Sequence, residues 1–187
     1  MNKTQFNKIN FTLLKEGKIS EFNQQRKKYL NLKVNLTGVN LSNANLSEVD
    51  LSNADLTDVN LTHAKIARAN LSGSDLNNAD LKDADLQKAN LSKTHLSWTD
   101  LTRANLHNAN LTNADLTNAK LHKANLSYAD LSGANLYRSN LSYADLSYAD
   151  LTNTNFHDGN DHMVDLTCAN LMGAKLTGAD LKDTDIK

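Results

Sequence analysis

The stretch FHDGNDHMVDL, residues 156–166, carries the residue types that most readily suggest chemistry. His157, Asp158, Asp161 and His162 lie close together there, and imidazole and carboxylate groups are common ligands of transition metals. Their spacing, however, matches none of the established metal-ligand motifs. We therefore expect no metal site in this stretch.

Catalytic motifs are missing from the rest of the sequence. It contains no nucleophile elbow, phosphate-binding loop, zinc-finger spacing or HExxH motif. Serine and threonine recur so regularly that none stands out as a nucleophile, and solvated turns account for them. The single cysteine, Cys168, excludes an intrachain disulfide. We expect a protein that is not an enzyme and that holds no cofactor.

A five-residue repeat organises most of the chain. From Leu36 to Ile186 every fifth residue is apolar with one exception, and 27 of these 31 positions are leucine. The exceptions to leucine are Ile66, Phe156, Asp161 and Ile186. The residue two places earlier is small or β-branched, most often alanine, and the residue between them is Asn or Asp in 27 repeats. A pattern this dense indicates a repeat protein.

A period of five fits neither ordinary secondary structure. On an α-helix, successive leucines are separated by about 140° and form no stripe. On a straight strand the leucines change faces at every repeat. All of them reach one core only if the chain bends once per repeat, so the sequence predicts a solenoid.

The pattern Ala-Asn/Asp-Leu-Ser/Thr-X, clear in ANLTNADLTNAKLHKANL (residues 109–126), resembles the pentapeptide-repeat family. The resemblance covers residues 34–187. It implies an all-β solenoid, a right-handed quadrilateral β-helix with four repeats per coil and about eight coils. We accordingly divide the chain into a helical N-terminal cap, residues 1–33, and a β-helix, residues 34–187.

A coil of twenty residues gives definite stacking expectations. Tyr128, Tyr148 and Cys168 should form one outward column, with Tyr143 and Met163 in the next. Gly73, Gly133 and Gly173 should share another. An exposed group of Tyr and Met side chains suits a protein interface, although aromatics scattered on a polar rod remain an alternative. The candidate interaction patch is Tyr128, Tyr137, Tyr143, Tyr148 and Met163.

The same coil length places Asp161 between Leu141 and Leu181 in the neighbouring coils. A bare carboxylate in a leucine ladder is costly, so we expect the backbone to bulge outward, with Phe156 filling part of the vacated volume. The bulge is either a tolerated loop or a partner-binding feature. The candidate bulge is Phe156, His157, Asp158, Gly159, Asn160, Asp161 and His162.

The N-terminal residues are expected to cover the first coil, since an open coil exposes unpaired backbone groups. Residues 4–16 read as one helix ending at Gly17, and Ser20 is expected to cap a second over residues 21–31. The stretch GKISEFNQQR resembles the N-terminal cap of family members, which implies cap roles for the aromatic, Asn and Arg residues. The predicted cap residues are Phe6, Ile9, Leu13, Phe22, Asn23, Arg26 and Tyr29. No C-terminal cap is visible, which leaves a homodimer through the last coil open.

Charge separates the two parts of the chain. Residues 1–30 carry seven Lys or Arg and two Glu, whereas residues 31–187 carry thirteen basic and nineteen acidic residues. The whole chain has a formal net charge of −1, which gives no case for direct binding to nucleic acid or a membrane surface. With no signal-peptide or membrane-span pattern, we expect a cytoplasmic protein.

Two functions are consistent with these features. The first is a non-catalytic scaffold that binds a protein partner. The second follows the family's quinolone-resistance branch, whose resemblance implies a protein that mimics DNA toward gyrase or another DNA-binding protein. Mimicry needs dense carboxylates along the rod. Lys65, His95, Lys120 and Lys175 interrupt the Asn/Asp positions, which favours the scaffold.

Overall fold

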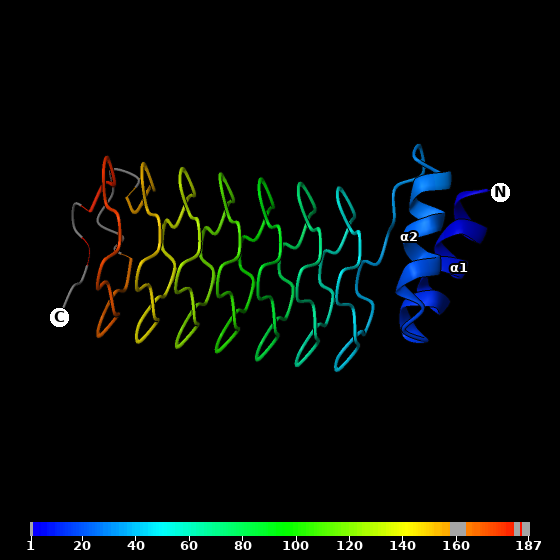
Figure 1. Ribbon diagram of the computed structural model, residues 1–187, viewed down its shortest axis with the longest axis horizontal. Helices are drawn as coiled ribbons and strands as arrows, with labels where there is room; N and C mark the ends of the chain where they lie inside the picture. The colour runs from blue at the N-terminus through cyan, green and yellow to red at the C-terminus, as the bar shows by residue number, and fades with distance from the viewer. Residues whose placement is uncertain (1, 158–163, 182–183, 185–187) are drawn as a thin grey trace.

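The protein is a straight rod with two helices packed across one end (Figure 1). The computed structural model describes residues 2–157, 164–181 and 184. Helices α1 (Lys3–Lys15) and α2 (Ile19–Lys28) form the N-terminal end, and the stacked coils follow to the far end of the rod (Figure 1). The helices predicted before the first repeat are therefore present.

Local sequence sets the ends of α1. Asn2 is the N-cap, and its side chain accepts a hydrogen bond from the Gln5 backbone N–H. The Gln5 side chain in turn accepts one from the Asn2 backbone N–H, which makes a capping box. At the other end Gly17 has φ 68°, and the N–H groups of Gly17 and Lys18 donate to the carbonyls of Leu14 and Leu13. This Schellman arrangement ends the helix where glycine tolerates the left-handed backbone.

Helix α2 differs from its prediction at both ends. It starts at Ile19 with Lys18 as N-cap, and Lys18 makes no side-chain capping bond, so the expectation that Ser20 caps the helix is wrong. The short Schellman turn after α1 brings the chain into the second helix before Ser20 is reached. The last helical residue is Lys28, and Tyr29 closes the helix by donating its N–H to the Gln25 carbonyl.

Parallel pairing between residues twenty apart builds the rod. The bridges run Asn35↔Asp55, Asp55↔Asp75 and onward, one per repeat, so four repeats complete a coil. Along the rod the bridges are flanked by pairs of backbone hydrogen bonds, as when Leu56 N donates to Asp75 O at 2.7 Å and Asp75 N donates to Ala54 O at 3.0 Å. Within the described residues the pairing stays at one bridge residue per repeat, because a corner interrupts the extended backbone every five residues.

A tight turn makes each corner. At Leu41–Ala44, for example, Ala44 N donates to Leu41 O at 3.1 Å, and Asn43 has φ 59°. Positive φ at the second central residue is the mark of a type II turn, which favours Gly or Asn. Repeats with Lys, Arg, Trp or Tyr at this position hold them in the same left-handed conformation. The corner residue therefore projects from an edge of the rod.

The interior consists of two stacked apolar columns on each side of the rod. Leucines from Leu36 to Leu166 are 2% exposed or less, and the alanines of the inner coils are similarly buried. Where Ser or Thr replaces alanine, its hydroxyl donates to a leucine carbonyl, as Thr99 does to Leu76 at 2.8 Å. In the last coil Leu171, Leu176 and Leu181 are only partly buried.

The cap meets the first coil through apolar and polar contacts. Phe6, Leu13 and Phe22 are buried, and Tyr29 lies edge-on to Phe6 with ring centroids 5.9 Å apart. Ile9 is 42% exposed, so its expected place on the first coil is wrong. It lies on the solvent side of α1, because the buried side is formed by residues at helical spacing from Phe6.

Two polar side chains of α2 bond directly to coil backbone. Asn23 donates from Nδ2 to the Glu48 carbonyl at 3.0 Å and accepts from the Asp50 N–H at 2.9 Å. Arg26 donates to the Ser52 carbonyl at 2.5 Å. The amide of Asn23 thus takes the place of a further coil and satisfies backbone groups that the end of the stack leaves unpaired.

Candidate protein-interaction surface

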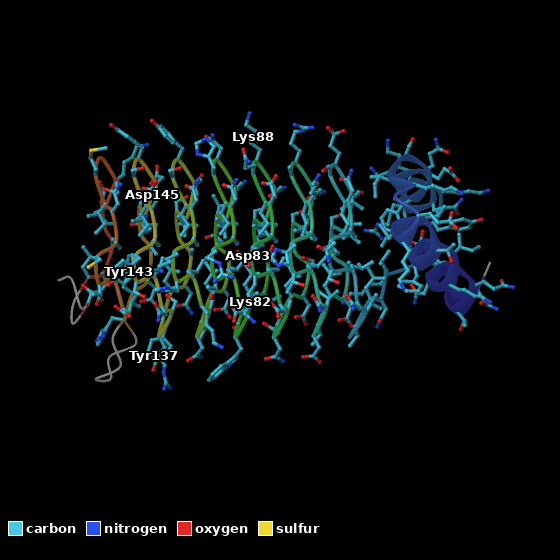
Figure 2. All side chains as sticks on the ribbon, turned by 90° about the horizontal axis from the view of Figure 1, so that it is seen from below. Lys82, Asp83, Lys88, Tyr137, Tyr143 and Asp145 are labelled. Atoms are coloured by element: carbon cyan, nitrogen blue, oxygen red, sulfur yellow. The ribbon has the colours of Figure 1, made fainter. Side chains whose placement is uncertain are left out.

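Near the C-terminal end of the rod the sequence Ser-Tyr-Ala-Asp occurs three times, at residues 127–130, 142–145 and 147–150. Each tyrosine occupies a left-handed corner position, and the three rings of Tyr128, Tyr143 and Tyr148 are 53%, 55% and 48% exposed. Figure 2 shows Tyr143 and Asp145 toward the end of the rod that lies away from the helices. We define the tyrosine face as Tyr128, Asp130, Tyr143, Asp145, Tyr148 and Met172.

The face spans two neighbouring edges of the rod, the strip between them, which carries Asp145, and the start of the following side, which carries Asp130. Tyr143 projects at one edge and Tyr128 and Tyr148 at the next, because each is the corner residue of its repeat. The rings of Tyr128 and Tyr148 stack with centroids 4.9 Å apart and 16° between their planes. This separation is close to the spacing of paired strands, so the coil pairing itself sets the stack.

Two histidines hold the tyrosines from the side. His107 lies edge-on to Tyr128 and His122 edge-on to Tyr143, each with centroids 5.6 Å apart. The Ser127 hydroxyl donates to Asn125 Oδ1 at 2.6 Å, so at 2.8 Å it accepts a hydrogen bond from His107 Nδ1–H. The rings of the face are therefore held in place before any partner arrives.

His122 makes the same contacts at the neighbouring edge of the rod, beside Tyr143. Its Nδ1 lies 2.8 Å from the Ser142 hydroxyl, which donates to Asn140 Oδ1 at 2.6 Å. The small serines that precede Tyr128 and Tyr143 thus each anchor a histidine from the coil before. The sequence interpretation missed both histidines, although their placement twenty residues before a Ser-Tyr pair was available as a signal.

A change of register decides what lies beneath Tyr148. Up to Asn135↔Asn155 the pairing joins residues twenty apart, but from Asn140↔Asp165 onward it joins residues twenty-five apart. One five-residue repeat is therefore left out of the ladder. Leu141 donates its N–H to Asp165, so its neighbour in the next coil is Leu166, and the expected place of Asp161 between Leu141 and Leu181 is wrong.

This change also corrects the expected columns. Cys168 lies in the same column as Tyr143 and not in that of Tyr148, because Tyr143 N donates to Thr167 O. Gly173 lies next to Tyr148 in the following coil. The column that was expected to contain Gly173 continues instead with Gly178, because Asn153 N donates to Thr177 O. The earlier expectation assumed twenty residues in every coil, and the longer coil moves each later residue by one side of the rod.

Three other predicted residues, Tyr137, Phe156 and His157, are not part of the tyrosine face. Tyr137 is half-buried beside Arg138, whose guanidinium lies 5.9 Å from its ring centroid, and Figure 2 shows Tyr137 apart from Tyr143. Phe156 is buried in the ladder and His157 is half-buried. Asp158, Gly159, Asn160, Asp161, His162 and Met163 lie outside the described residues. Met172, on the tyrosine face, was not predicted.

Gly173 allows the Tyr148 ring its position. A Cβ atom at residue 173 would lie 2.7 Å from Tyr148 Cδ1, closer than any normal contact. Gly173→Ala is therefore expected to displace the Tyr148 ring and to weaken the tyrosine signal in near-ultraviolet circular dichroism. Gly38→Ala is the matched control, because Gly38 has a similar φ of 66° and no atom within 4 Å of the added Cβ. Equal spectral changes in the two variants would contradict the proposed contact.

Ion pairs concentrate nearer the middle of the rod, where Figure 2 shows Lys82 and Asp83. Lys82 Nζ lies 3.2 Å from Asp80 and 3.3 Å from Asp100, and Arg103 donates to both carboxylate oxygens of Asp83. The hydrogen bond from Arg103 lowers the pKa of Asp83. Burial raises the pKa of Asp100, but hydrogen bonds from Thr102 and Lys82 outweigh it, so the pKa lies below its ordinary value.

These lowered pKa values predict acid destabilisation. A carboxylate whose pKa is lower in the folded than in the unfolded chain stabilises the fold above the unfolded pKa of about 3.9, and this contribution is lost as the pH falls through the folded pKa. The urea concentration at the midpoint of unfolding should stay constant from pH about 7 to 5 and should decrease when the pH falls below about 4. Asp100→Asn should reduce the drop. A wild-type midpoint that stays level down to pH about 2 would contradict this account.

Two further kinds of site were considered in the described part of the chain. No group of three or more His, Cys, Asp or Glu side chains there is placed to hold a metal ion. None of its helices has the length and apolar character needed to cross a membrane. Within these residues, the tyrosine face is the strongest candidate for a binding surface.

Comparison with known proteins agrees with the architecture. The model of the pentapeptide repeats matches eight copies, in segments that together span residues 35–158 and 164–187. The chain belongs to the pentapeptide repeat family. Pentapeptide repeat proteins form right-handed quadrilateral β-helices, which confirms the predicted fold. No curated protein matches the chain in sequence.

Several solved structures of pentapeptide repeat proteins are similar to this chain. One from the Arabidopsis thaliana thylakoid lumen is 30% identical and covers 54% of this chain and 66% of its own, with a TM-score of 0.42. HetL from Nostoc sp. strain PCC 7120, involved in heterocyst differentiation regulation, is 33% identical over 81% of this chain and 82% of HetL, with a TM-score of 0.25. Another Nostoc PCC 7120 protein is 36% identical over 52% of this chain and 80% of its own, with a TM-score of 0.47.

Proposed function

We propose that this pentapeptide repeat protein is a non-catalytic scaffold that binds a protein partner through the tyrosine face. The observation that carries the proposal is the exposure of Tyr128, Tyr143 and Tyr148, each about half exposed, on a surface that histidine contacts and coil pairing hold in place. Tyrosine supplies a large, amphipathic contact area, and rings that are already ordered lose little entropy on binding.

The backbone adds a second argument. Tyr128, Tyr143 and Tyr148 have φ of 60°, 59° and 58°, in a region where a residue other than glycine is disfavoured. Glycine occupies the same corner position elsewhere in the rod, so the fold does not require tyrosine there. Polar residues such as Asn, Lys and Arg hold most other corners in the same conformation, so three exposed aromatic rings at these corners are better explained by contact with a partner than by the needs of the turn.

The alternative of DNA mimicry finds less support. Lysine or arginine neutralises Asp80, Asp83, Asp100 and Asp150 within the described residues. A protein that imitates the phosphate backbone needs these charges to be free and continuous along the rod. The mixed charge of the surface favours the scaffold.

Affinity capture with mass-spectrometric identification tests the proposal. The tagged full chain is compared with a variant carrying Tyr128→Ala, Tyr143→Ala and Tyr148→Ala, and with Trp98→Ala as a control that removes an exposed aromatic from another edge. We expect a partner that is retained by Trp98→Ala and lost with the three tyrosines. A partner lost equally from both variants, or no specific partner, would sink the proposal.

A further variant separates the tyrosine face from the predicted bulge. Deleting residues 158–162 preserves the pairing of Asn140 with Asp165, since the ladder already leaves one repeat out. We expect this variant to fold and to retain the partner. Loss of the partner from the folded deletion variant alone would move the interface to the predicted bulge.

We also propose that a second copy of the chain covers the last coil. Leu171, Leu176 and Leu181 are partly exposed there, whereas the leucines of the inner coils are buried. Light scattering of the wild type should then give the mass of a dimer, and Leu176→Lys should give a monomer. A wild-type monomer at micromolar concentration would exclude the dimer.

A further inference from the structure

Two carboxylates of the tyrosine face have a free oxygen. Asp130 Oδ1 accepts from the Ser132 N–H at 2.9 Å and from its hydroxyl at 2.6 Å. Asp145 Oδ1 accepts from the Ser147 N–H and from Asn170 Nδ2, both at 3.0 Å. Within the described residues, the Oδ2 atom of each carboxylate has neither a hydrogen bond nor an ion pair. Each aspartate therefore accepts the hydrogen bonds of its own turn through one oxygen and leaves its other charged oxygen free to bind a cation.

Equivalent aspartates elsewhere on the rod use this second oxygen for a cation. Asp80 and Asp150 accept from their own turns through Oδ1, and their Oδ2 atoms lie 3.2 Å from Lys82 and 3.0 Å from Lys175. The Asn/Asp position of the repeat is thus well placed to bind a cationic side chain that reaches it from the surface. Asp130 and Asp145 offer the same geometry without an internal cation.

The tyrosines beside these carboxylates are suited to the same kind of group. Each tyrosine precedes an aspartate by two residues, so every Ser-Tyr-Ala-Asp repeat has a ring at its corner and a carboxylate at the start of the side that follows. Lys123 Nζ already lies over the Tyr143 ring, 5.8 Å from its centroid. A cation is attracted both to the face of a ring and to a nearby carboxylate.

We propose that the tyrosine face binds arginine side chains presented by an extended segment of the partner. This inference rests on the proposed scaffold function and adds the chemistry of the partner. The flat guanidinium group packs against the exposed part of a tyrosine ring, and its N–H groups donate to the free oxygen of Asp130 or Asp145. Lysine, a compact and strongly hydrated charge, makes only one of these contacts well at a time.

Binding of a defined peptide tests this proposal. A fluorescein-labelled peptide with three Arg-Gly units is titrated with the full chain at low salt and followed by fluorescence anisotropy, beside a peptide with three Lys-Gly units. We expect the wild type to bind the arginine peptide about fivefold more tightly than the lysine peptide. Asp130→Asn combined with Asp145→Asn, and Tyr128→Leu combined with Tyr148→Leu, should each weaken binding about tenfold.

Asp85→Asn is the matched control for charge. Asp85 lies in the same column as Asp145, and its Oδ1 accepts from its own turn and from an Asn of the next coil in the same way. No tyrosine occupies the corner residues of its neighbouring repeats, Asp83 and Lys88, so Asp85→Asn should change binding less than twofold. Equal weakening by Asp85→Asn, or equal affinity for the two peptides, would overturn the arginine proposal.

The two proposals fail in different ways. If the arginine peptide does not bind while capture of a partner still depends on the tyrosines, the scaffold stands and arginine recognition is wrong. If the peptide binds through the tyrosine face but the captured partner ignores the tyrosine substitutions, the proposed scaffold surface is wrong. Far-ultraviolet circular dichroism of every variant separates either result from unfolding.

Discussion

Leu106→Ala is expected to lower the free energy of unfolding by about 2–5 kcal/mol. Leu106 is fully buried in the middle of the rod, where coils above and below cover it. The substitution removes apolar contacts and leaves a cavity that paired coils on both sides prevent from collapsing. Because each coil is stabilised by its neighbours, the defect weakens the stack on both sides of it.

The same column offers a control for this prediction. Leu171 occupies the corresponding place in the last coil and is only partly buried, so Leu171→Ala should cost clearly less. Urea unfolding followed by circular dichroism measures both variants, with the slope compared to detect loss of two-state behaviour. If the two substitutions shift the midpoint equally, burial by stacked coils is not the main source of stability.

Phe22→Ala is expected to have a comparable effect at the other end, about 3–5 kcal/mol. Phe22 is fully buried in the core cluster, in the helix whose next residue, Asn23, bonds to the backbone of Glu48 and Asp50. Loss of the ring loosens α2 and with it the amide that occupies the open edge of the first coil. An uncovered edge pairs with other chains, so the variant should also associate at micromolar concentration.

Ile9→Ala tests whether burial explains this result. Ile9 is an apolar residue of the same cap but is 42% exposed, so its truncation should change the unfolding midpoint little. Thermal unfolding and light scattering are measured for both variants beside the wild type. A Phe22→Ala protein that remains monomeric with an unchanged midpoint would show that the cap is not needed to hold the first coil.

The period of the sequence predicted the rod correctly because it leaves few physical solutions. Leucine at every fifth position can be buried only by a chain that turns at each repeat, and the small residue two places earlier must then face the same core. Prediction was weaker in the cap, where no repeat constrains the residues. Ser20 looked like a helix cap and Ile9 like a core residue, but the turn at Gly17 and the docking of the two helices decided otherwise.

The tyrosine face shows the same division. Exposure of Tyr128, Tyr143 and Tyr148 was predicted from their place in the repeat, and the structure has all three on the surface. Their neighbours were not all predicted, because a twenty-residue coil was assumed throughout. The coil of twenty-five residues moves Gly173 beneath Tyr148, and without that change the ring would meet a side chain in place of a glycine.

The sequence by itself determined which residues face inward, how often the chain turns and that the architecture is a stacked coil. These properties are local, since they follow from the order of small, polar and apolar residues within five positions. Only the tertiary structure decided the number of residues in each coil and therefore which residues lie above one another. Stacking depends on backbone pairing between residues twenty or twenty-five apart, and the free energy of that pairing is settled by the whole coil and not by any single repeat.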